Sequence, residues 1–130
     1  MAPALPPGSV GTAAVMRMVI AIIQPTKLSA VKEALAKIGV TRMTVCDAQG
    51  YARQRGQVGM YRGNEYKTNL LRKIALEIVV NEDFLERTVE TITSVARTGP
   101  EGNIGDGKIF VLPAADVIEI SRLTRGPEAV

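Results

Sequence analysis

The chain has 130 residues, of which 46% are hydrophobic and 22% are charged. This length and this balance fit one globular domain with a packed core, and they exclude an intrinsically disordered chain. Sixteen basic and thirteen acidic residues give a formal net charge of +3, and no block of like charges forms a surface for nucleic acid, so we expect no nucleic-acid partner.

The cysteine content and the apolar runs indicate where the protein resides. A single cysteine, Cys46, cannot form a disulfide within the chain, which favours a reducing compartment such as the cytoplasm. The longest apolar run, from Met18 to Ile23, is far too short to cross a bilayer, so we expect a protein that is not embedded in a membrane. Residues 1–15 lack the positive charge that begins a secretory signal and predict a disordered tail, unless translation starts at Met16.

The first half of the patterned sequence predicts a strand, a helix and a second strand. Residues 17–24 form a β-branched run that stops at a proline, as a buried strand does. Apolar residues at helical spacing from Ser29 to Ile38, with Ser29 as the N-cap and Gly39 after the end, predict an amphipathic helix. Alternation through residues 42–48 predicts a strand with one buried face.

The second half repeats this order. Alternating apolar residues over 74–80 predict a strand, and the acidic turn and apolar stripe over 82–97 predict a helix. Residues 108–112 predict a last strand that is halted by Pro113, with a short extended piece over 117–120. The order βαββαβ predicts an α+β, ferredoxin-like domain, in which two helices pack on one face of an antiparallel sheet.

Two segments depart from this pattern. Residues 50–72 are too long and too polar for an ordinary connection between paired strands, and such loops are usually functional or disordered. Residues 98–107 contain four glycines between a helix and a strand. This second segment either presents several backbone N–H groups to an anion or forms a flexible turn, and the pattern alone gives the two interpretations about equal weight.

The ferredoxin-like order serves many functions, so residues must decide between them. An RNA-binding domain of this fold needs aromatic side chains on the open sheet face, whereas three of the five aromatic residues here are tyrosines in the polar loop. The chain has no histidine, and no nucleophile stands beside a base, so we expect no enzyme beyond a weak ATPase at most. Cys46 is interpreted as a packing residue.

Several segments together resemble the PII signal transduction proteins. Residues 61–66, YRGNEY, and residues 105–111, GDGKIFV, are similar to the two signatures of that family, and the resemblance extends over residues 16–125. It implies a homotrimer of ferredoxin-like units with an adenine nucleotide (ATP, ADP or AMP) in each cleft between neighbours. It also implies that residues 50–72 correspond to the family's T-loop, through which it regulates partner proteins, and leaves residues 126–130 as a C-terminal tail.

The resemblance assigns nucleotide contacts to individual residues. The adenine would lie near Thr44, Glu77 and Val79, and the phosphates near Arg53, Gly105, Asp106, Gly107 and Lys108. The chemistry agrees with this assignment, because glycine amides together with Arg and Lys side chains form a phosphate cradle.

Further roles are implied for four residues of the loop and its base. Gln54 would help to bind the Mg²⁺ that joins ATP to 2-oxoglutarate, and Lys73 would pair with the distal carboxylate of that ligand. Tyr66 corresponds to a tyrosine that is uridylylated in some members, and Arg62 resembles the residue that plugs an ammonium channel. The partners implied are an ammonium channel, a bicarbonate transporter or a metabolic enzyme.

The chain also departs from the family pattern. Residues 100–102 are an insertion, Asn103 replaces a usual lysine, and Gln24 stands where a basic residue is frequent. An ungapped alignment puts Glu119 and Ser121 in place of a basic pair, which Arg122 or Arg125 would restore if the strand slipped. The alternative function is therefore a paralogue associated with carbon metabolism that senses ADP or AMP with bicarbonate.

Overall fold

The computed structural model describes residues 15–53 and 68–130, and the following account concerns these residues. They form four β-strands, two α-helices and two short 3₁₀ helices, in the order β1 (Met16–Ile23), η1 (Pro25–Lys27), α1 (Leu28–Lys37), β2 (Thr44–Arg53), β3 (Thr68–Asn81), α2 (Glu82–Ala96), β4 (Gly107–Ala114) and η2 (Gly126–Ala129).

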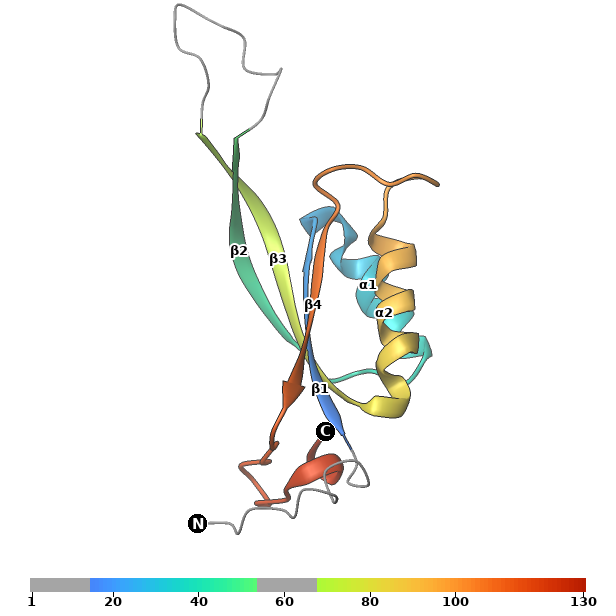
Figure 1. Ribbon diagram of the computed structural model, residues 1–130, viewed down its shortest axis with the longest axis vertical. Helices are drawn as coiled ribbons and strands as arrows, with labels where there is room; N and C mark the ends of the chain where they lie inside the picture. The colour runs from blue at the N-terminus through green and yellow to red at the C-terminus, as the bar shows by residue number, and fades with distance from the viewer. Residues whose placement is uncertain (1–14, 54–67) are drawn as a thin grey trace, which may run out of the picture.

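The four strands form one antiparallel sheet in the order β2-β3-β1-β4, and both helices lie on the same face of it (Figure 1). The predicted ferredoxin-like fold is confirmed. Its core lies between the helices and the two central strands, because every second residue of β1 and β3 points to the helices. These core residues are Val19, Ala21 and Ile23 of β1 and Ile74, Leu76, Ile78 and Val80 of β3.

Both helices bury the apolar stripes that the sequence predicts, but α1 does not begin in the predicted way. Helix α1 follows the 3₁₀ turn of Pro25–Lys27, and its N-cap is Lys27 without a side-chain bond, so the prediction of Ser29 as the cap was wrong. Gly39 follows the helix at a φ of +88°, which suits the glycine expected there. In α2 the core includes a polar residue, Thr88, which is tolerated because its hydroxyl donates to the carbonyl oxygen of Phe84 at 2.7 Å.

Three strands extend beyond their predicted ends. Strand β2 continues to Arg53 and β3 starts at Thr68, so parts of the predicted loop of residues 50–72 form a two-stranded ribbon that reaches away from the helices (Figure 1). Polar residues are tolerated in this ribbon because pairing between the two strands satisfies the hydrogen-bonding groups of the backbone without an apolar core. Strand β4 includes Pro113, which pairs with Arg17 of β1. Because β4 is an edge strand, the missing N–H of the proline costs little.

The face of the sheet opposite the helices is largely apolar. The register puts Met18 beside Leu112 and Ile20 beside Phe110 on this face. Phe110 is 50% exposed and Leu112 is 43% exposed. We refer to this surface as the open face.

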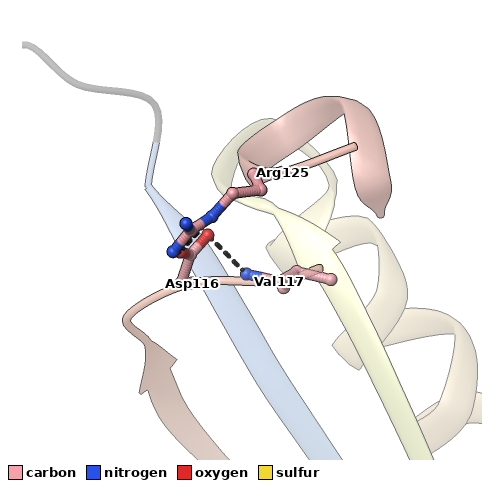
Figure 2. A network of polar contacts seen from close by, with 3 residues as sticks. All are labelled: Asp116, Val117 and Arg125. Carbon is pink, nitrogen blue, oxygen red and sulfur yellow. Dashed lines mark hydrogen bonds and ion pairs between the residues drawn. The ribbon is translucent and has the colours of Figure 1, made fainter. Parts of the chain in front are cut away.

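The chain beyond β4 turns back on itself through a contact between two side chains. The guanidinium group of Arg125 donates two hydrogen bonds to one carboxylate oxygen of Asp116, and the N–H of Val117 donates to the other oxygen at 2.9 Å (Figure 2). The bond from Arg125 is the main cause that lowers the pKa of Asp116 from its ordinary value. The expected extended piece over 117–120 is reduced to one bridge, between Ile118 and Arg125. Within the described ranges, no helix is both long and apolar enough to span a membrane.

Candidate functional site

The segment between α2 and β4, residues 98–107, is held in one conformation, and we refer to it as the glycine loop. Gly105 and Gly107 have φ angles of +104° and +123°, a region that side chains disfavour. A Cβ atom on Gly107 would lie 1.7 Å from the carbonyl oxygen of Ile22, whereas one on Gly105 would have no neighbour within 4 Å. Gly107 therefore permits a close approach of β4 to β1 that no other residue allows.

The carboxylate of Asp106 organises the loop from within. One oxygen, Oδ2, accepts hydrogen bonds from the backbone N–H groups of Thr98 at 2.9 Å and of Asn103 at 2.8 Å. The other, Oδ1, accepts from the hydroxyl of Thr98 at 2.7 Å and from Nε2 of Gln24 at 3.0 Å. The backbone bond from Thr98, followed by those from its hydroxyl and from Asn103, lowers the pKa of Asp106 to about 2. The carboxylate is therefore ionised at neutral pH.

Two lysines flank the loop. Nζ of Lys73, on β3, donates to the carbonyl oxygen of Gly105 at 2.6 Å. Its aliphatic part passes over Gly50, where an added Cβ would lie 3.3 Å from Lys73 Cγ. Lys108, the second residue of β4, pairs with Ile22 and follows the alternation that places it on the open face. One lysine is thus bonded to the loop, and a second lysine follows it directly in the chain.

The residues assigned to adenine gather on a different part of the open face. Thr44 of β2 pairs directly with Glu77 of β3, and Val79 follows two residues later on the same face. Lys108 lies on β4, at the opposite edge of the sheet. Strands are about 4.8 Å apart, so about 14 Å separate the two outer strands. Within one chain, the residues assigned to adenine and the residues assigned to phosphate therefore form two separate sets.

The remaining assigned residues lie further along the ribbon. Arg53 pairs with Thr68, five residues beyond the pair of Ala48 with Lys73, which places its backbone about 17 Å further along β2. Within one chain, the ribbon thus carries the Arg53 backbone away from the glycine loop. Gln54, Arg62 and Tyr66 lie outside the described residues.

Sequence reasoning did not find several of these contacts. Gln24 was noted only as a departure from the family, yet its amide donates to Asp106. Arg125, considered as a replacement cation, is paired with Asp116. The carboxylate of Glu119 lies 3.8 Å from the guanidinium of Arg42, so Glu119 also has a basic partner. No sequence signal identifies these partners, because only the tertiary structure brings the two residues of each pair together. In residues 15–53 and 68–130, no group of three or more acidic or cysteine side chains could hold a metal ion.

The sequence and the fold match a known family. Residues 16–124 match the family model described as nitrogen regulatory protein P-II. The chain is 50% identical over 115 residues to nitrogen regulatory protein GlnK1 of Methanosarcina mazei, which covers 88% of this chain and 97% of that protein. It is 49% identical over 105 residues to nitrogen regulatory protein P-II 1 of Escherichia coli, which covers 81% of this chain and 91% of that protein.

Solved structures agree with these matches. Bacillus subtilis GlnK superposes with a TM-score of 0.73 and 34% identity, covering 89% of this chain and 99% of that chain. A complex of B. subtilis GlnK with ATP gives a TM-score of 0.73 at 31% identity, covering 89% and 96% of the two chains. Arabidopsis thaliana PII bound to citrate gives 0.70 at 38% identity, covering 88% of each.

These matches, together with the ferredoxin-like fold, define a regulatory protein. The chain belongs to the nitrogen regulatory protein P-II family. The family resemblance seen in the two sequence signatures is thereby confirmed.

Proposed function

We propose that this protein is a cytoplasmic, non-enzymatic signal transducer that binds an adenine nucleotide between the subunits of a homotrimer. The nucleotide would select among conformations of the T-loop, residues 50–72, and each conformation would dock on a different partner. The observation that carries this proposal is the glycine loop, which is bonded to Asp106 and Lys73 and is followed directly by Lys108. The ATP complex of the similar B. subtilis GlnK supports the class of ligand.

The glycine loop suits the phosphate groups of a nucleotide. Backbone N–H groups in glycine-rich turns can converge on an anion, and lysine ammonium groups add charge. Lys108 is exposed on the open face beside the loop, where a phosphate could reach its ammonium group. A charge-assisted hydrogen bond contributes roughly 1.5 to 3 kcal/mol, so a few such contacts suffice for micromolar affinity.

The separation of the two sets of residues favours a site that is completed by a neighbouring copy. Thr44, Glu77 and Val79 would receive the adenine of a nucleotide whose phosphates lie on the glycine loop of the next subunit. The exposed apolar open face, with Phe110 and Leu112, gives such an assembly a surface to bury. A homotrimer accounts for both features.

The connection from the site to partners would run along the ribbon. Lys73 joins the glycine loop to β3, and β3 leads directly to the T-loop. Phosphate groups or a small carboxylate near Lys73 would compete for its ammonium group and so alter the base of the T-loop. An ammonium channel, a bicarbonate transporter or a metabolic enzyme are the partners we expect, with Arg62 as a contact and Tyr66 as a modifiable residue.

A second candidate within the family is a sensor of ADP or AMP with bicarbonate. The pairing of Arg125 with Asp116 favours it, because that guanidinium is not available to a distal phosphate. Mg²⁺ and 2-oxoglutarate belong to the first candidate, in which Gln54 and Lys73 would bind them. Titration with 2-oxoglutarate and with bicarbonate in the presence of each nucleotide separates the two.

Light scattering and calorimetry test the proposal together. We expect a mass of three chains and binding of an adenine nucleotide at micromolar concentration. Lys108→Ala should weaken binding roughly tenfold or more, since one charge-assisted contact is lost. The matched control, Lys32→Ala, removes an exposed lysine of α1 and should leave binding unchanged. A stable monomer that binds no nucleotide at millimolar concentration would contradict the proposal.

A further inference from the structure

We propose that Asp106 is a positioning residue of the phosphate site, which fixes the shape of the glycine loop and touches neither the nucleotide nor a metal ion. This inference rests on the proposed function, because it concerns the same site. It replaces the role that the family resemblance implied for Asp106 as a nucleotide contact.

The hydrogen bonds of Asp106 account for its whole accepting capacity. An ionised carboxylate has two oxygens with about four lone-pair directions in total. Thr98 fills two of these directions through its N–H and its hydroxyl, and Asn103 and Gln24 fill one each. No acceptor site remains for a ligand hydroxyl or a cation. Donors of the protein itself therefore use all the accepting directions of this carboxylate.

The donors come from three parts of the chain. Gln24 follows β1, Thr98 is the first residue of the glycine loop after α2, and Asn103 lies in the middle of that loop. The sequence separation between Gln24 and Asp106 is 82 residues. One side chain thus ties the end of a helix and the end of a strand to the loop between α2 and β4.

The charge of Asp106 argues against direct contact with phosphate. Its pKa of about 2 keeps it ionised at neutral pH, and Lys27 contributes a smaller lowering through its charge. Two anions in contact would repel each other, whereas a carboxylate turned into its own loop stabilises backbone N–H groups. The charge of Asp106 therefore favours bonds to its own loop over contact with a phosphate.

Three consecutive residues of the loop are each fixed in a different way. The carbonyl oxygen of Gly105 accepts from Lys73, the side chain of Asp106 accepts its four bonds, and Gly107 approaches the carbonyl oxygen of Ile22. The loop consequently has its bound shape before the ligand arrives. Preorganisation of this kind raises affinity because less ordering remains to be done on binding.

Two substitutions separate a positioning role from direct contact. In Asp106→Asn, the amide oxygen can still accept from the N–H groups of Thr98 and Asn103, and the amide nitrogen can donate to the Thr98 hydroxyl and to a rotated Gln24 amide. Asp106→Ala removes all four bonds. A positioning residue should tolerate the first change and not the second, whereas a metal ligand should tolerate neither.

The experiment measures affinity and loop order in the full chain. Calorimetry with ADP alone and with ATP and Mg²⁺ should give affinities for Asp106→Asn within about threefold of wild type and at least about tenfold weaker for Asp106→Ala. Hydrogen exchange of ligand-free protein should quicken at the Thr98 and Asn103 amides in Asp106→Ala only. Asp83→Ala, which removes an exposed carboxylate of α2, is the control and should change neither.

Several outcomes would overturn the inference. A loss of ATP and Mg²⁺ binding in Asp106→Asn, with both amides still protected, would identify a direct metal contact. Unchanged affinity and exchange in Asp106→Ala would show that the four bonds are dispensable. If Asp106→Ala fails to fold, Thr98→Val removes one donor with little change of shape and should weaken binding about three- to tenfold. If wild type binds no nucleotide, the proposed function fails, and amide exchange still decides whether Asp106 positions the loop.

Discussion

Lys73 and Gly105 lie 32 positions apart in the chain, and the ammonium group of the first donates to the carbonyl oxygen of the second at 2.6 Å. This contact joins β3, the strand that follows the T-loop, to the glycine loop, which is proposed to hold phosphate. A Cβ atom at Gly50 would lie 3.3 Å from Lys73 Cγ, so a larger residue there would press on this lysine side chain. One hydrogen bond therefore connects β3 to the glycine loop.

The first prediction concerns this connection. Lys73→Met keeps most of the aliphatic length and removes the ammonium group, so the glycine loop should lose its bond to β3. We expect faster hydrogen exchange over residues 98–106 and weaker nucleotide binding, with a thermal midpoint that changes by only a few degrees. Lys37→Met, on the exposed side of α1, is the matched control. Equal exchange in the two variants would mean that the contact does not order the loop.

The second prediction compares two glycines with positive φ. Gly107→Ala should destabilise the protein by about 2 to 5 kcal/mol, because strain adds to a clash with the Ile22 carbonyl. Gly105→Ala meets no atom within 4 Å and should cost only about 1 to 2 kcal/mol from its conformation. Urea unfolding of both variants measures the difference. Similar losses for the two would rule out the close approach as the reason for Gly107.

The third prediction is a loss of stability in acid. The folded pKa of Asp106 is about 2, below the ordinary value of 3.8, so its contribution to stability is fully present above the ordinary value. It should be lost as the pH falls through the range between the two values. Asp116 is shifted in the same direction and should add to this loss. Urea midpoints at pH 7, 4 and 2.5 should fall less steeply for Asp106→Asn than for wild type, and parallel curves would refute the assignment.

The fourth prediction concerns the open face. Phe110→Asp places a carboxylate on the apolar surface that the homotrimer would bury, so the variant should dissociate into monomers. Ser94→Asp introduces the same group on the exposed surface of α2 and should leave the assembly intact. Light scattering of both proteins at the same concentration provides the measurement. A trimer that survives Phe110→Asp would place the interface elsewhere.

The fifth prediction is a preference for short nucleotides. Asn103 contributes no charge to the glycine loop, Arg125 is paired with Asp116, and Glu119, which stands in the place of a basic residue, is paired with Arg42. Loss of two charge-assisted contacts to distal phosphates weakens ATP by about a hundredfold or more, while ADP and AMP lose less. Calorimetric titration of all three should rank ATP with Mg²⁺ below ADP. Tenfold tighter binding of ATP than of ADP would contradict this order.

The sequence alone determined the fold, since local periodicity reports which face of an element is buried. The alternation from Ile74 to Val80 and the stripe of α2 need no knowledge of their partners, because apolar side chains at these spacings can only be shielded on one side. The same reasoning ended β2 too early, at Ala48, and began β3 too late, at residue 74. Polar residues on a paired ribbon carry no burial signal, although their backbones are hydrogen-bonded.

Within the candidate site, the sequence located the glycine loop but not what holds it. Four glycines in ten residues mark an unusual backbone, and this signal is local. The donors to Asp106 are not local, because Gln24 reaches it only through the antiparallel pairing that sets the end of β1 beside the start of β4.

The contacts of Lys73, Gly50 and Arg125 were likewise decided by the tertiary structure. Each depends on strand order, register or a reversal of the chain, which bring together residues that the sequence keeps apart. The spacing of apolar residues is a property of the local sequence, whereas the contact partner of a residue is set by how the whole sheet assembles. The sequence therefore determined the family and the elements, and only the folded sheet decided that Asp106 faces its own loop.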